Sequence, residues 1–278
     1  MHTINEPGRP AAGASTPAAA LPGTWQSGDN AVIANTLQIV GETLAESMRL
    51  TPGSRVLDVA AGSGNASLAL ARRWHRVIST DRIPAILAIG AERARAEGLG
   101  IDFQLADAEG LGFADGSFDA VVSTFGVMFA HDQRRAAIEL VRVCRDGSTI
   151  GHTNWTPESF IADLLPLIAR YRPGVPIQNR CAWGDRAWLY AAFGSVTTSI
   201  ECTQRAYTFR YRDADHFMRV LRSCFGPIRS VFDRIDGIAK RAAEQEIRDL
   251  LRHRNAADDG SIEIVSDYLE SILVKEIG

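Results

Sequence analysis

Residues 56–64, with the sequence VLDVAAGSG, decide the fold of this chain. Residues 56–59 have the short apolar pattern of a buried strand, and the small residues that follow predict a tight turn. Residues 65–73 then predict a helix. A strand, a glycine turn and a helix in this order are typical of the first βα unit of a parallel sheet.

The alternation of strands and helices continues along the chain. A helix is expected before the first strand, at residues 33–48. Further strand patterns lie at residues 77–81, 101–105, 118–124, 148–153, 196–202 and 268–274. Residues 207–211 either extend the strand at 196–202 or pair with it. Because parallel strands need helical crossovers, we expect an α/β fold: a Rossmann-like, doubly wound, mostly parallel seven-stranded sheet with a helical lid.

The composition narrows the class of function. The chain is 46% hydrophobic and 23% charged with a net charge of −3, so it lacks the general basic field that would favour nucleic acid as main partner. No apolar run reaches the length of a membrane span, and the N-terminus lacks the charged start and apolar centre of a signal peptide. The four cysteines form no CxxC pair. We therefore expect a cytoplasmic protein without a bound metal; its oligomeric state stays open.

Acidic residues end the first three expected strands. Asp58 closes the first, Asp81 closes the second, and Asp107 follows the third. In a doubly wound sheet these strand ends line one crevice, where ligands bind. The carboxylate of Asp81 can accept hydrogen bonds from both hydroxyls of a ribose, and Asp107 can accept one from the exocyclic amine of an adenine. Gly62 and Gly64 allow a ligand to approach the backbone closely. The series predicts a site for an adenine nucleoside.

Two stretches of the sequence resemble those of a known enzyme family. The stretch at residues 56–64 resembles motif I of the class I S-adenosylmethionine (SAM)-dependent methyltransferases, near the methyltransferase type 11 branch that includes the ubiquinone and menaquinone biosynthesis enzymes. Residues 113–121, FADGSFDAV, are similar to that family's approach to strand four. The match covers roughly residues 30 to 155. The resemblance implies that SAM is the cofactor and that the reaction transfers a methyl group.

The resemblance also implies which residues hold the cofactor. Asp58 and the glycine turn would hold the methionine part, Asp81 the ribose, and Asp107 with Ala108 the adenine. The full expected set is Asp58, Ala60, Gly62, Gly64, Asn65, Asp81, Arg82, Asp107, Ala108, Glu109, Ser123 and Thr124.

The composition and the order of the expected elements predict the domain organisation. A disordered tail is expected at residues 1–22, a SAM-binding core at 23–155 and a continuation of the core at 184–212. Two lid parts are expected at 156–183 and 213–255, and the last core strand lies within 256–278.

The acceptor side is less well determined by the sequence. His131 follows the fourth strand and is the candidate general base, although a solvent-exposed residue at a helix start would look the same. An apolar acceptor pocket could be lined by Trp25, Phe125, Met128, Phe129, Trp155 and Trp183. We expect the acceptor to be a small, lipophilic or aromatic molecule with an oxygen, nitrogen or carbon nucleophile.

Two alternatives remain open at this stage. Gly62 and Gly64 followed by Asp81 also resemble the dinucleotide fingerprint of an NAD(P)-dependent oxidoreductase, although Ser67 stands in the place of the third glycine. A shift in melting temperature with SAM but not with NADH would separate the two. The second alternative is a non-catalytic SAM-binding protein, against which turnover to S-adenosylhomocysteine would count.

Overall fold

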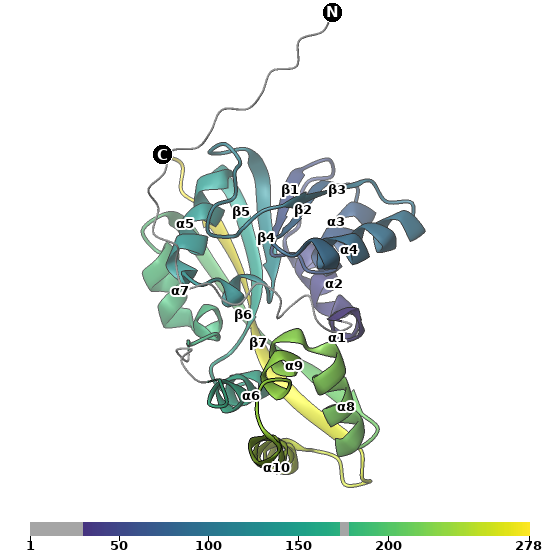
Figure 1. The fold of residues 1–278 in the computed structure, drawn as a ribbon. Coiled ribbons are helices and arrows are strands. Elements are labelled where there is room, and N and C mark those ends of the chain that lie inside the picture. The colour runs from purple at the N-terminus through teal and green to yellow at the C-terminus, as the bar shows by residue number, and fades with distance from the viewer. Residues whose placement is uncertain (1–29, 173–177) are drawn as a thin grey trace, which may run out of the picture.

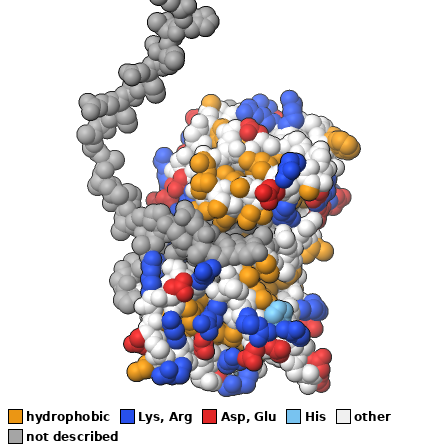
Figure 2. All heavy atoms as spheres, turned by 45° about the vertical axis from the view of Figure 1, so that its right-hand side comes forward, with side chains coloured by type: hydrophobic (Ala, Val, Ile, Leu, Met, Phe, Trp, Pro, Cys, Tyr) orange, Lys and Arg blue, Asp and Glu red, His pale blue; other side chains and the backbone are white. Residues whose placement is uncertain are grey.

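A computed structural model describes residues 30–172 and 178–278 of the chain. The expected disordered tail at residues 1–22 and Trp25 lie outside the described residues. Within the described residues, no helix combines the length and the apolar character needed to cross a membrane. Basic and acidic side chains are interspersed on the face of the molecule that Figure 2 shows.

The sheet has seven strands in the order β3-β2-β1-β4-β5-β7-β6 (Figure 1). Strands β1 to β5 run parallel, and β7 is antiparallel to both β5 and β6. This arrangement confirms the predicted mostly parallel, doubly wound sheet. The strands are β1 (Arg55–Val59), β2 (Arg76–Asp81), β3 (Ile101–Leu105), β4 (Phe118–Thr124), β5 (Cys144–Trp155), β6 (Thr197–Tyr211) and β7 (Ile262–Lys275).

Helices cover both faces of the sheet. Figure 1 shows α2, α3 and α4 on one side and α5 and α7 on the other, as the crossovers of a doubly wound sheet require. The helices are α1 (Asn30–Thr36), α2 (Gln38–Ser47), α3 (Asn65–Arg72), α4 (Pro84–Ala96), α5 (Gln133–Val143), α6 (Phe160–Ala169), α7 (Arg186–Phe193), α8 (Ala214–Cys224), α9 (Gly226–Phe232) and α10 (Gly237–Arg254), with short 3₁₀ turns at Val127–Phe129 and Ala182–Gly184.

The expected single helix at residues 33–48 is two helices, α1 and α2, separated at Leu37. Side chains from other elements bind the last carbonyls of α1. The Asn65 amide donates to the Ala34 carbonyl over 2.7 Å, and the Tyr207 hydroxyl donates to the Thr36 carbonyl over 2.9 Å. The apolar spacing along the sequence is continuous across Leu37, so the sequence pattern does not show the break.

The C-terminal part of the chain builds a long pair of strands that carries a group of helices. β6 is continuous, so residues 207–211 extend the strand at 196–202, and β7 begins at residue 262, earlier than the expected 268. The two strands pair along almost their whole length. They extend beyond the other strands of the sheet to the region of α8, with α6 and α10 nearby (Figure 1). Helices α8, α9 and α10 lie between β6 and β7 in the chain, where the sequence predicts a helical insertion.

Candidate cofactor and acceptor site

The turn after β1 has an unusual backbone conformation. Gly62 and Gly64 have φ angles of 57° and 83°, in the left-handed region that glycine adopts without steric cost. Ala60 shares this region with a φ of 53°, which is unfavourable for a residue with a Cβ. Gly126, at the end of β4, packs against it so closely that an added Cβ would lie 2.1 Å from the Ala60 carbonyl oxygen. The turn is therefore held in shape by the end of the neighbouring strand.

Asp81 connects the end of β2 to this turn. One carboxylate oxygen accepts a hydrogen bond from the Gly62 N–H over 3.0 Å, and the other accepts one from the Ile83 N–H over 2.9 Å. Burial raises the pKa of Asp81, while these backbone donors lower it and favour the carboxylate. Each oxygen has a second lone pair. Asp81 can therefore accept further hydrogen bonds from a ligand.

A cavity of about 250 Å³ opens beside these groups, at the carboxyl ends of the parallel strands. Eight of the twelve expected cofactor residues line it: Ala60, Gly62, Asn65, Asp81, Arg82, Asp107, Ala108 and Thr124. Apolar side chains from β2 to α4, Ile83 and Ile86 among them, lie beside these polar groups. An apolar slot flanked by carboxylates at two strand ends suits an adenine and its ribose.

The other four expected cofactor residues do not line the cavity. Gly64 begins α3, and Ser123 is fully buried, with its hydroxyl donating to the Val59 carbonyl over 2.8 Å. Glu109 accepts a hydrogen bond from the His131 N–H over 2.5 Å. Asp58 is fully buried behind the turn, where the Ser67 hydroxyl donates to it over 2.6 Å. Burial raises the pKa of Asp58 to about 7.

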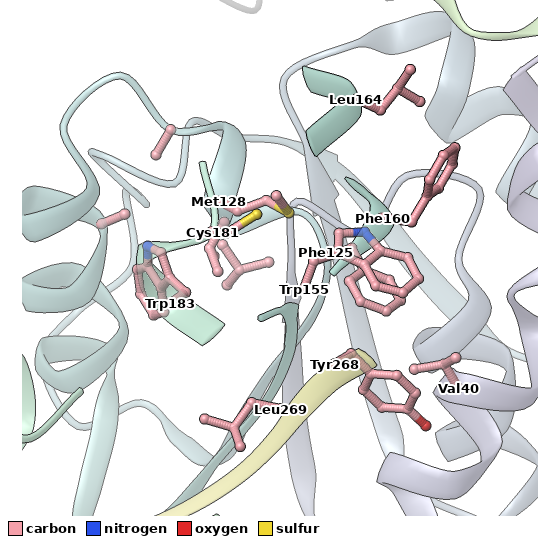
Figure 3. Packing of buried hydrophobic residues seen from close by; sticks show 14 of the residues in the cluster. Val40, Phe125, Met128, Trp155, Phe160, Leu164, Cys181, Trp183, Tyr268 and Leu269 are labelled. Atoms are coloured by element: carbon pink, nitrogen blue, oxygen red, sulfur yellow. The ribbon is translucent and has the colours of Figure 1, made fainter. Parts of the chain in front are cut away.

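The predicted acceptor residues fall into two groups. Phe125, Phe129 and Trp155 line the cavity, and the rings of Phe125 and Trp155 stack with centroids 4.1 Å apart. Figure 3 shows this pair within the same hydrophobic cluster as Trp183 and Met128. Trp183 and Met128 are fully buried and are not among the lining residues. Trp25 lies outside the described residues.

Several residues that line the cavity were not predicted from the sequence. They lie in α1, α6, β6 and α8, or directly follow α1 or α8 in the chain. They include Leu37, Phe160, Leu164, Phe209, Tyr211, Phe217, Leu221 and Phe225. The alternation of aromatic residues at 207, 209 and 211 was the available signal, because alternate residues of a strand share one face.

His131 is solvent-exposed and is not among the residues that line the cavity. It precedes Asp132, which caps α5 by accepting a hydrogen bond from the Arg135 N–H over 2.9 Å. Its role as a base stays a prediction. Within residues 30–172 and 178–278, no group of three or more His, Cys, Asp or Glu side chains is arranged to hold a metal ion.

The shape of the site fits SAM. A Cβ built on Gly62 would meet only the Ile86 side chain, at 3.9 Å, so the space beside this backbone is open to a ligand. Asp81 lies next to that space with acceptor capacity for ribose hydroxyls. Asp107 and Ala108 line the same cavity beyond it. The glycine turn and the acids at two strand ends thus line one crevice at the carboxyl ends of the strands, and their chemistry fits an adenosyl cofactor.

Comparisons with known proteins agree with this geometry. Residues 57–150 match the family model described as a methyltransferase domain. An uncharacterized protein of Mycobacterium tuberculosis is 39% identical over 79% of this chain and 82% of its own length. A demethylmenaquinone methyltransferase of Thermobifida fusca is 33% identical over 57% of this chain and 78% of its own length.

Solved structures share the fold. A putative methyltransferase of Bacillus halodurans aligns with a TM-score of 0.60 over 85% of this chain and 99% of that one, at 17% identity. The YcgJ protein of Bacillus subtilis aligns with a TM-score of 0.59 over 88% of this chain and 100% of that one, also at 17% identity. The chain belongs to the class I SAM-dependent methyltransferases, and it is an enzyme that uses SAM as its cofactor rather than an NAD(P)-dependent oxidoreductase.

Proposed function

We propose that this enzyme transfers the methyl group of SAM to a small, largely apolar molecule that binds in the half of the cavity beyond Phe125. One observation carries the proposal. Among the described residues, the side chains that line this half come mainly from Trp155, α6, β6 and α8 and are aromatic or aliphatic. None of these lining side chains is an acid, a histidine, a lysine or an arginine. Burying a charge there without a partner would be costly.

In this proposal, different residues bind the cofactor and the acceptor in the two halves of the cavity. SAM supplies an electrophilic methyl group on a sulfonium centre. Gly62 admits close approach of the ligand to the backbone, and Asp81 accepts hydrogen bonds from the ribose hydroxyls. Thr124, the last residue of β4, and Phe125, which follows it, line the cavity, and in this proposal they lie between the cofactor and the acceptor. Holding two reactants in line is worth about 7 to 11 kcal/mol, so positioning can supply most of the rate enhancement.

Residues 156–183 and 213–255 form a lid in this proposal, and residues 173–177 of the first part lie outside the described residues. Phe160 and Leu164 of α6 face the same cavity as Phe217 and Leu221 of α8. These side chains would exclude water from the reacting atoms, and the helices would separate to admit the acceptor.

A screen with isotopically labelled SAM tests the proposal. Phenols, quinols, amines and lipophilic acids are incubated with the enzyme, and methylated products are detected by mass. The Thermobifida fusca relative is named as a demethylmenaquinone methyltransferase, so demethylmenaquinone is an early candidate. Label should enter uncharged aromatic compounds first. Transfer confined to RNA, protein or highly charged compounds would refute the proposed acceptor class.

A further inference from the structure

Two hydrogen-bonding side-chain groups interrupt the apolar half of the cavity. They are the indole N–H of Trp155, at the end of β5, and the hydroxyl of Tyr211, at the end of β6. The other side chains that line this half, Leu37 and Phe225 among them, carry no oxygen or nitrogen. Polar groups that face an otherwise apolar cavity are the ones that fix the orientation of a ligand.

Packing holds the Trp155 ring in place, but its indole N–H makes no hydrogen bond to a described residue. Its side chain is 4% exposed and stacks on Phe125, and the Tyr268 ring packs edge-on against it with centroids 6.2 Å apart. Figure 3 shows the indole nitrogen on the side of the ring away from Tyr268. Within the described part of the chain, no group accepts a hydrogen bond from this N–H. An indole N–H is a donor only, so its missing partner is an acceptor atom.

Tyr211 is similarly positioned at the lid end of the cavity. Its ring packs edge-on against Phe217, with centroids 4.9 Å apart. Burial raises its pKa to about 12, so the hydroxyl stays protonated at neutral pH. No residue among those the structure describes hydrogen-bonds to this hydroxyl. Tyr207 lies on the same strand, but its hydroxyl donates to the Thr36 carbonyl.

We propose that Trp155 Nε1–H and the Tyr211 hydroxyl bind oxygen atoms of the methyl acceptor and thereby select uncharged, flat, apolar molecules that carry a carbonyl or hydroxyl group. This inference rests on the proposed function of the same cavity. A ligand that excludes water from these two donors leaves them without a partner, which is costly, and an acceptor oxygen on the ligand removes that cost. A hydrocarbon of the same shape leaves both donors unpaired, so the site distinguishes the two ligands.

Two probes of nearly equal shape test the inference. 1-Tetralone carries one carbonyl, and tetralin is the corresponding hydrocarbon. Their affinities are measured by tryptophan fluorescence on the full chain saturated with S-adenosylhomocysteine. Tyr211→Phe removes only the hydroxyl and should weaken 1-tetralone about fivefold or more while tetralin changes less than about twofold. Trp155→Phe, read by calorimetry, should also weaken 1-tetralone more than tetralin.

Tyr207→Phe is the matched control, because it removes a hydroxyl that is already bonded inside the protein. Any effect through α1 should change both probes alike. If Tyr211→Phe and Trp155→Phe both leave the ratio of the two affinities as in the wild type, the inference is wrong. It is also wrong if wild-type protein that binds S-adenosylhomocysteine binds neither probe, a result that leaves the methyltransferase activity itself untouched.

Discussion

The carboxylate of Asp81 accepts a hydrogen bond from the backbone N–H of Gly62 over 3.0 Å, so the end of β2 holds the glycine turn that follows β1. The same side chain lines the cavity. One residue therefore shapes the turn and also presents acceptor atoms to a ligand. Changes at Asp81 or in the turn should affect cofactor affinity together.

The contact between Ala60 and Gly126 gives the first prediction. A Cβ at residue 126 would lie 2.1 Å from the Ala60 carbonyl oxygen and 2.6 Å from the Ala60 Cβ, so Gly126→Ala must displace the turn. Overpacking of this kind costs about 1 to 3 kcal/mol. We expect a lower melting temperature and at least about a tenfold loss of affinity for S-adenosylhomocysteine.

Gly100→Ala is the control for that experiment, because an added Cβ there meets no atom within 4 Å. Its melting temperature and affinity should stay close to the wild type. Equal affinities of Gly126→Ala and wild type would show that the turn tolerates the displacement.

The burial of Asp58 predicts a pH dependence of stability. Burial, with a smaller contribution from the charge of Asp81, raises its pKa to about 7, whereas hydrogen bonds from Ser67 lower it. Between about pH 4 and 7 the folded protein holds a proton that the unfolded chain has released, so this residue's contribution to stability falls as pH rises through that range. Asp58→Asn removes the titrating group.

Urea unfolding of the ligand-free protein at pH 5 and pH 8 measures this effect. The free energy of unfolding of Asp58→Asn should rise relative to wild type by roughly 2 to 4 kcal/mol between the two pH values. A constant difference between variant and wild type would mean that Asp58 does not titrate in this range.

A base role for His131 and its exposed position predict different changes in kcat for one variant, His131→Ala. If His131 is the general base, His131→Ala should lower kcat by roughly 10² to 10⁴ on a hydroxyl acceptor. Its exposed position outside the cavity lining leads us to expect a change in kcat of less than about threefold, with cofactor affinity retained. A loss in the larger range on an acceptor of high pKa would establish the base.

The lid proposal predicts a difference in mobility. Amide hydrogen exchange in α6 and in α8 to α10 should be faster than in β1 to β5 without ligand, and should slow when S-adenosylhomocysteine and an acceptor bind. Exchange in these helices as slow as in the strands, with product still released quickly, would argue against a moving lid.

Local sequence patterns were sufficient to predict the sheet and most of the polar residues that line the cavity. Local patterns around residues 56–64 and at the strand ends determine where Gly62, Asp81 and Asp107 meet. The acceptor side depends on long-range packing. Tyr211 and Phe217 reach the cavity only because β6 and β7 extend past the sheet. Trp183 is a buried aromatic like Trp155, but it does not line the cavity. Aromatic residues in core and pocket look alike in a sequence.

The central claim is that SAM binds in the cavity against Asp81, and calorimetric titration with S-adenosylhomocysteine tests it most directly. Wild type should bind, and Asp81→Ala should bind about 10- to 100-fold more weakly, because charged hydrogen bonds contribute about 1.5 to 3 kcal/mol. Asp102→Ala, which alters an exposed carboxylate bonded to Gln104, should bind like wild type. Absence of binding by wild type, or equal affinities of wild type and Asp81→Ala, would contradict the claim.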